Sequence, residues 1–224
     1  MRAFWRHLLV ILWKDTLLDL RTRELVAPML VFALLVIVIF NFVFDLRPAI
    51  VLIVAPGVLW VAFTFAGTLG LSRTFALEKD HGCIDGLMLC PISRDILYLG
   101  KLSGSFLFIL VVQMVMLPIF SLLYNLPFFL PELWLILALA TLGFGAVGTS
   151  FSAMAVNTRA REIMLPLLFF PIVVPVIIAA VEATGGVLRG DPWGDYSRWI
   201  GLTVAFDAIF LVVAAVTFEF VLGE

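Results

Sequence analysis

The sequence predicts an all-α polytopic membrane protein with six transmembrane helices. The first observation is the composition: 63% of the 224 residues are hydrophobic, 13% are charged, and the mean hydropathy is +1.18. Soluble domains carry about 45–50% apolar and about 25% charged residues, and a domain of this size has too little interior to hide the excess. The second observation is that the apolar residues gather in long runs, each close to the roughly 20 residues that a helix needs to cross the hydrocarbon core.

Six such runs fill the chain, which is predicted to form one transmembrane domain over residues 1–224. The predicted spans are 25–44, 49–71, 102–124, 131–156, 162–181 and 199–221. Several of them contain proline, which removes a backbone hydrogen bond and bends a helix; these residues are Pro56, Pro118, Pro166, Pro171 and Pro175. Unbroken apolar runs argue against a transmembrane barrel, whose strands alternate in polarity.

The segment that precedes the first span, residues 1–24, is not predicted to cross the membrane. Its apolar part, 8–13, is too short to span, and no small-residue cleavage site follows it, so a signal peptide is not predicted. Five cations together with Trp5 and Trp13 suit a helix that lies along the cytoplasmic headgroups. We therefore expect an N-terminal interfacial helix.

The distribution of Lys and Arg predicts the orientation. Eleven of the 14 fall in the N-terminal segment, in the loop after span two and in the loop after span four, and the other three are Arg47, Arg189 and Arg198. Cytoplasmic loops carry the excess of positive charge. Both termini of this multi-pass protein are therefore predicted to be cytoplasmic.

Several function classes are excluded. A net charge of −2 lacks the basic excess of a nucleic-acid binder. The sequence has no phosphate-binding G-x-x-x-x-G-K-[ST] pattern, so the chain is not expected to hydrolyse ATP on its own. It also has neither the G-x-S-x-G pattern nor the H-E-x-x-H pattern. His81, Cys83 and Cys90 share one loop, but three ligands at this spacing match no standard zinc site. We expect reduced thiols there, no metal, no bound cofactor and no catalytic residue.

The cytoplasmic loop between spans two and three, residues 72–101, is the most unusual segment. Charged residues lead into a short apolar stretch, 87–90, which Pro91 ends, and Ser93 offers an N-cap for the helix that follows. A short helix with an apolar face outside the membrane fits a groove on another protein. A segment lying on the membrane surface is the alternative, and docking is favoured.

Few polar residues fall inside the spans. Asp207 lies well inside span six, where a lone carboxylate costs roughly 2.5–3.5 kcal/mol, so it must be neutralised, paired or turned toward water. A pathway role and a structural bond between helices are equally compatible with it. Trp60, inside span two, indicates either core packing or a pocket, and packing is favoured. Gly148 and Ser152 form a small-x-x-x-small pair, which favours packing within the chain over a dimer contact.

Three segments carry a resemblance to a known family. The sequence reads APGVLWVA at 55–62 and EKDHGCIDGLMLCP at 78–91, followed by Gly100-Lys101. These segments resemble the CcmB family, the permease subunits of the ABC transporter for cytochrome c maturation, also called haem exporter protein B. The similarity in length, span number and loop placement extends over essentially the whole chain, and it is weakest in sequence over spans four to six.

The resemblance implies an architecture and a set of partners. CcmB permeases are similar to ABC-2 exporters, with an N-terminal interfacial helix, six spans and a cytoplasmic coupling helix that seats on a separate ATPase. The positions that match the coupling helix are Asp85, Gly86, Leu87, Met88 and Pro91, with Glu78 just upstream. The implied partners are the ATPase CcmA, the haem-handling membrane subunit CcmC and the haem chaperone CcmE, with haem as the cargo of the complex. A second permease half is also expected, either another copy of this chain or a different subunit. The resemblance further implies a bacterial inner membrane, with a mitochondrial inner membrane as the less favoured alternative.

Two alternatives remain at this point. An ABC-2 permease for a lipid, a polysaccharide or a drug would share the architecture, because a fold does not fix the cargo. A membrane scaffold that transports nothing is the third reading.

Overall fold

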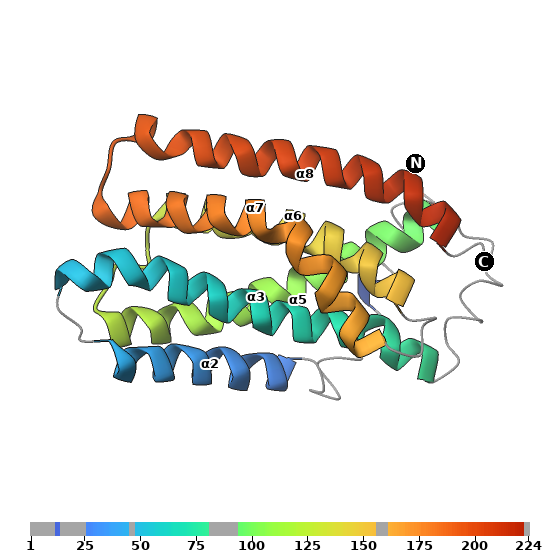
Figure 1. The fold of residues 1–224 in the computed structure, drawn as a ribbon, viewed down its shortest axis with the longest axis horizontal. Helices are drawn as coiled ribbons and strands as arrows, with labels where there is room; N and C mark the ends of the chain where they lie inside the picture. Colours follow the sequence, from blue (N-terminus) through green and yellow to red (C-terminus); the bar gives the residue numbers. More distant parts are fainter. Residues whose placement is uncertain (1–11, 14–25, 45–47, 81–93, 156–160, 222–224) are drawn as a thin grey trace.

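The computed structural model describes residues 12–13, 26–44, 48–80, 94–155 and 161–221, and their regular secondary structure is entirely helical. Six long helices run along one axis (Figure 1). They are α2 (Val26–Val43), α3 (Pro48–Asp80), α5 (Arg94–Tyr124), α6 (Pro131–Ala155), α7 (Arg161–Arg189) and α8 (Trp193–Val221). Within the described ranges, six helices are long and apolar enough to cross a membrane. The prediction of an all-α protein with six membrane-spanning helices is confirmed.

Several helices extend beyond the apolar runs that the sequence marks. Helix α3 continues to Asp80, α5 already begins at Arg94, and α7 ends at Arg189. Hydropathy marks only the part of a helix that lies in hydrocarbon, whereas the backbone bonds of a helix continue into the polar headgroup region. As a result, both ends of the predicted loop 72–101 belong to helices, up to Asp80 in α3 and from Arg94 in α5.

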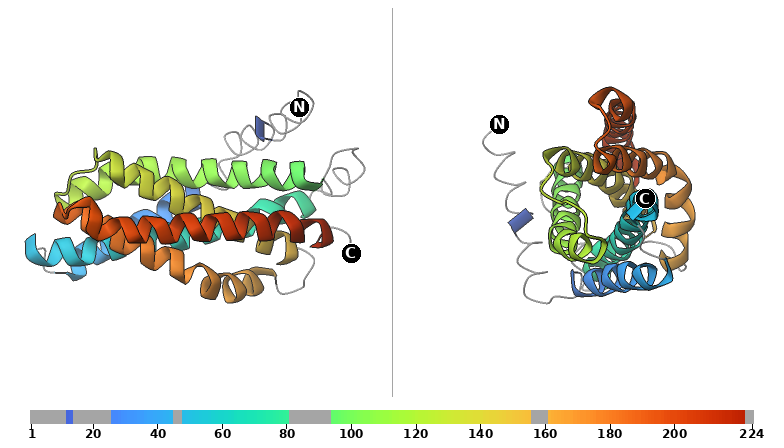
Figure 2. Two further views of the ribbon diagram at one scale, coloured as in Figure 1. Left: turned by 90° about the horizontal axis from the view of Figure 1, so that it is seen from above. Right: turned by 90° about the vertical axis from the view of Figure 1, so that its left-hand side faces the viewer.

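Helix α6 is the centre of the bundle. It is the most buried of the six described helices, and it packs against α3, α5, α7 and α8. Helices α2 and α8 are the least buried, and they lie at opposite edges when the bundle is viewed from one end (Figure 2). Their outward faces carry large apolar side chains such as Phe42 and Val212, which suit contact with lipid tails.

Helix α7 contains Pro166, Pro171 and Pro175 and still remains one helix. Its N-terminal part bends away from the common axis of the bundle (Figure 1). Each proline removes a backbone hydrogen bond and displaces the preceding turn, so three of them within one helix account for the bend. The kinks that the sequence predicts in this span are therefore present.

The turn between α7 and α8 follows from its residue types. Gly190 has φ of +74°, and its N–H donates to the carbonyl of Val187, while the N–H of Asp191 donates to the carbonyl of Gly186. This arrangement ends a helix with a glycine in the left-handed region. The carboxylate of Asp191 also accepts from Arg189 at 2.9 Å, which fixes the turn at the end of the bundle where α8 begins.

Parts of two predicted segments lie outside the described residues. In the expected interfacial segment 1–24, the structure describes Leu12 and Trp13 alone. Glu78 belongs to the C-terminal part of α3, whereas the other predicted coupling residues lie outside the described ranges, as do His81, Cys83 and Cys90.

Candidate functional site

The buried face of α3 carries polar side chains at four-residue intervals. Trp60, Thr64 and Thr68 are each at least 94% buried. A spacing of four places side chains one above another on the same face of a helix. This face therefore presents a row of hydrogen-bonding groups to the interior of an otherwise apolar bundle.

Trp60 connects α3 to α7. Its indole Nε1–H donates to Oγ1 of Thr184 over 3.0 Å, and both side chains are buried. The indole also meets the ring of Phe63 edge-on, with 6.2 Å between the ring centroids. A buried indole N–H normally finds an acceptor, and Thr184 supplies it. Trp60 is thus a packed core residue, and it also lines the cavity beside it.

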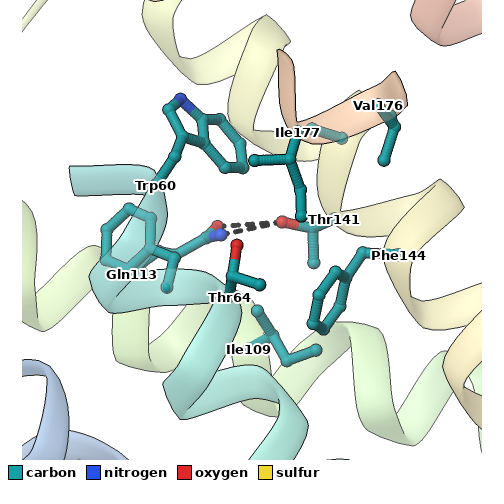
Figure 3. Close-up of a pocket in the computed structure, with 10 residues that line it drawn as sticks. Trp60, Thr64, Ile109, Gln113, Thr141, Phe144, Val176 and Ile177 are labelled. Atoms are coloured by element: carbon teal, nitrogen blue, oxygen red, sulfur yellow. Dashed lines mark hydrogen bonds between the residues drawn. The ribbon is translucent and has the colours of Figure 1, made fainter. Parts of the chain in front are cut away.

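A small cavity lies between α3, α5, α6 and α7 (Figure 3). Its walls are mainly apolar and include Phe63, Ile109, Phe144 and Val176. It leaves about 10 Å³ for the centre of a water molecule, which is close to the minimum that one ordered water needs. In this arrangement the cavity admits a single water molecule and excludes anything as large as a porphyrin.

The polar part of the cavity is a pair of side chains from α5 and α6. Nε2 of Gln113 donates to Oγ1 of Thr141 over 2.8 Å, and the Thr141 hydroxyl donates back to Oε1 of Gln113 over 3.1 Å. The hydroxyl of Thr64 points toward this pair from α3 (Figure 3). Three helices thus bring hydrogen-bonding groups to one point in the interior.

Asp207 lies on α8 and faces α6. Its side chain is 4% exposed, and its carboxylate lies against Gly143, where an added Cβ would overlap Oδ1 of Asp207. Neither carboxylate oxygen has a hydrogen-bond partner among the described residues. Asp207 is absent from the lining of the cavity, so the structure does not bring Asp207 and Trp60 into one site.

The small residues of α6 make close contacts inside the chain. Gly148 lies directly against Leu71 of α3, and Oγ of Ser152 donates to the carbonyl of Leu71 over 2.6 Å. A side chain at position 148 would collide with Leu71, so the absence of a Cβ lets the two helices approach. This pair of small residues serves packing between α3 and α6.

Sequence reasoning missed most of the residues that surround the cavity. Gln113 and Thr141 were not singled out, because each is one polar residue within a long apolar run, and Thr184 lies beyond the end of the predicted span 162–181. A usable signal was present in α3, where Trp60, Thr64 and Thr68 follow one another every four residues. The partners on other helices have no such signal, because a hydropathy pattern does not say which helix faces lie together.

The chemistry available to these groups is binding and packing. The cavity presents hydroxyl, amide and apolar surface, and among the described residues no group of three or more His, Cys, Asp and Glu is placed to hold a metal ion. Charged side chains such as Arg189, Asp191 and Arg198 lie near the turn between α7 and α8, away from the cavity.

The comparison with known proteins decides the family. The model of the CcmB protein family matches residues 6–222. The chain belongs to the CcmB family. The resemblance that the segments 55–62 and 78–91 predict is thereby confirmed over nearly the full length.

Curated relatives cover most of the chain. Heme exporter protein B of Pseudomonas aeruginosa is 30% identical over 190 residues, which are 84% of this chain and 85% of the relative. The protein of the same name from Rhodobacter capsulatus is 31% identical over 68% of this chain and 71% of the relative. The Escherichia coli protein is 26% identical over 88% of this chain and 91% of the relative. The similarity of this CcmB chain to its relatives thus extends over most of the bundle.

Proposed function

We propose that this CcmB chain is the membrane permease subunit of a haem exporter that serves cytochrome c maturation. The observation that carries the proposal is the family match over residues 6–222, together with relatives named heme exporter protein B. The multi-pass helical bundle agrees with a transporter subunit. No comparable observation favours either alternative, a permease for another cargo or a passive scaffold.

The proposal assigns ATP hydrolysis to a separate subunit. The sequence lacks a phosphate-binding loop, so the chain itself is non-catalytic and receives its energy through contact with a CcmA-like ATPase. Helices α3 and α5 support this role, because α3 ends at Asp80 and α5 begins at Arg94, so that both reach the same end of the bundle (Figure 1). The connection between them, with Leu87 and Met88 at its centre, is the proposed docking segment for the ATPase.

The remaining partners follow from the same proposal. A CcmC-like subunit and the chaperone CcmE handle haem, which is the cargo of the complex. The cavity within this chain admits about one water molecule. A porphyrin therefore needs another route, and an interface between this chain and a second membrane subunit, such as a second permease copy, provides one. In this proposal both termini lie in the cytoplasm of a bacterial cell, and the bundle lies in the inner membrane.

A gene deletion tests the proposed function. Membrane proteins of the deletion strain are denatured, separated and stained for haem, so that only covalently bound haem is detected. We expect the c-type bands to vanish, b-type haem to persist in absorption spectra, and a plasmid copy to restore the bands. If the c-type bands survive the deletion, the chain serves another cargo and the assignment to cytochrome c maturation is wrong.

A further inference from the structure

Asp207 occupies a position that is built around its carboxyl group. The side chain is 96% buried by residues of this chain, since 4% of it is exposed. Gly143 makes the room, because a Cβ at this position would overlap Oδ1 of Asp207 and would lie 3.1 Å from Cδ1 of Phe206. A helical side chain covers the turn on the N-terminal side of its own Cα. Glycine at 143 therefore uncovers the backbone carbonyls of the preceding turn of α6, those of Leu139 and Ala140.

The groups that α6 offers at this point accept hydrogen bonds and do not donate them. In the middle of a helix each backbone N–H is already bonded to the carbonyl four residues earlier, whereas each carbonyl keeps a second lone pair. An ionised carboxylate carries acceptors alone and finds no donor here. A neutral carboxylic acid has one O–H donor, which matches a free lone pair on α6.

No cation among the described residues neutralises Asp207. Neither of its oxygens has a hydrogen-bond partner there. Arg189 binds Asp191, and Arg198 lies over the ring of Trp199, 5.3 Å from its centroid. Lys101 is buried on α5 and has interactions of its own.

The other titratable groups of the helices that pack against α8 have different surroundings. On α5, the Tyr98 hydroxyl donates to the carbonyl of Ala146. On α7, Glu182 is exposed, and on α6, Glu132 lies in the first turn, far along the helix from Gly143. A side chain of another subunit would reach the Asp207 oxygens only if α8 moved away from α6, because both oxygens are buried within this chain.

We propose that Asp207 is a proton-binding site of the bundle: a carboxylic acid whose O–H donates to a backbone carbonyl of α6 beside Gly143 and so joins α8 to α6. The ligand is a proton, and the site consists of one side chain and the backbone that one glycine uncovers. Because α8 is among the least buried of the described helices, a bond of this kind in hydrocarbon is a specific anchor for it. Loss of the proton would leave a charge that no described group satisfies and would favour separation of α8 from α6.

Infrared spectroscopy of the intact chain in lipid nanodiscs at neutral pH tests the proposal. The wild-type protein is expected to show the C=O stretching band of a protonated carboxylic acid, and specific ¹³C-labelling of aspartate should shift it. Asp207→Asn should abolish the band, whereas the matched control Glu182→Gln should retain it. An aspartate-sensitive acid band that is missing in the wild type, or one that persists in Asp207→Asn, would overturn the proposal.

A second variant keeps the test decisive if Asp207→Asn does not fold. Gly143→Ala keeps the aspartate in the chain, but the added methyl group displaces its Oδ1 and covers the carbonyls of the preceding turn. The acid band should then shift to the higher frequency of a carboxyl group with a weaker hydrogen bond, and Gly201→Ala, on an open face of α8, should leave it unchanged. An unshifted band in Gly143→Ala would contradict a bond to the α6 backbone at this point. None of these measurements depends on the cargo, so the result is independent of the proposed function.

Discussion

The indole N–H of Trp60 on α3 donates to the hydroxyl of Thr184 on α7 over 3.0 Å, across 124 residues of sequence. Trp60 also lines the cavity, and the bond joins two helices that are not consecutive in the chain. Both groups are buried, so removing one partner leaves the other without a hydrogen bond in an apolar environment.

Replacing Thr184 by valine should destabilise the bundle by about 1–2 kcal/mol, because it leaves the Trp60 N–H unsatisfied. Thr184→Ser keeps the hydroxyl and should retain most of the stability. Thermal unfolding of the purified variants in detergent measures the difference. Unchanged stability in Thr184→Val would show that the hydrogen bond to Trp60 does not stabilise the bundle.

Gln113 and Thr141 should show a strong coupling in stability. Gln113→Leu and Thr141→Val each leave one buried polar group unpaired, and each should cost about 1–2 kcal/mol. The double variant removes both partners and should be less destabilised than the sum of the single variants. A double-mutant cycle in detergent gives the coupling energy, and strict additivity would mean that the two side chains do not stabilise each other.

The contact of Gly148 with Leu71 predicts a steric effect. Gly148→Ala places a methyl group onto Leu71 and should destabilise the protein by about 1–3 kcal/mol through overpacking. Gly201→Ala is the matched control, because no atom lies within 4 Å of its added Cβ, and alanine is a better helix former. Leu71→Ala in the Gly148→Ala background should recover part of the loss. If the control destabilises as much as Gly148→Ala, the close approach of α3 and α6 is not the cause.

The docking segment can be tested through ATPase activity. Leu87→Asp together with Met88→Asp introduces charge into the proposed apolar contact and should uncouple the ATPase, since unpaired buried charge at an interface costs several kcal/mol. Gly194→Asp is the control, because this exposed position lies beside the turn between α7 and α8. Co-purification and ATPase activity of the assembled complex are measured. Unchanged values in the Leu87/Met88 variant would refute the coupling role.

The orientation can be tested by thiol labelling. Gly194→Cys, in a background with Cys83→Ser and Cys90→Ser, should react with a membrane-impermeant reagent in intact cells, because the positive-inside distribution predicts that this turn lies outside the cytoplasm. A cysteine at Ser93 in the same background should react only after the membrane is opened. The reverse pattern of labelling would invert the topology.

The sequence predicted the helices well where their formation depends on residues that are neighbours in the chain. The runs at 131–156 and 25–44 predict α6 (Pro131–Ala155) and α2 (Val26–Val43) closely, because an apolar segment in lipid must satisfy its own backbone and so becomes a helix. The run at 162–181 ended too early for α7, which continues to Arg189, because Glu182 and the small residues that follow lower the hydropathy without ending the helix.

The candidate site was predicted only in part. Trp60 and Asp207 stood out because each is unusual in an apolar span, but their surroundings were not predictable. The sequence left a structural bond between helices open for Asp207. No donor among the described residues bonds to its oxygens, and the bond proposed above runs instead from a protonated Asp207 to the backbone of α6. Gln113 and Thr141 received no attention, although they provide the polar atoms of the cavity.

The sequence by itself determined the membrane class, the six helices and the absence of an ATP-binding loop, since each depends on composition or on residues that are neighbours in the chain. The tertiary structure alone decided that Trp60 meets Thr184, that Gln113 meets Thr141 and that Asp207 rests on Gly143. The physical reason is that hydropathy is nearly uniform around a helix that is apolar on all sides. Which face of each helix turns inward is therefore set by the close packing of side chains between helices.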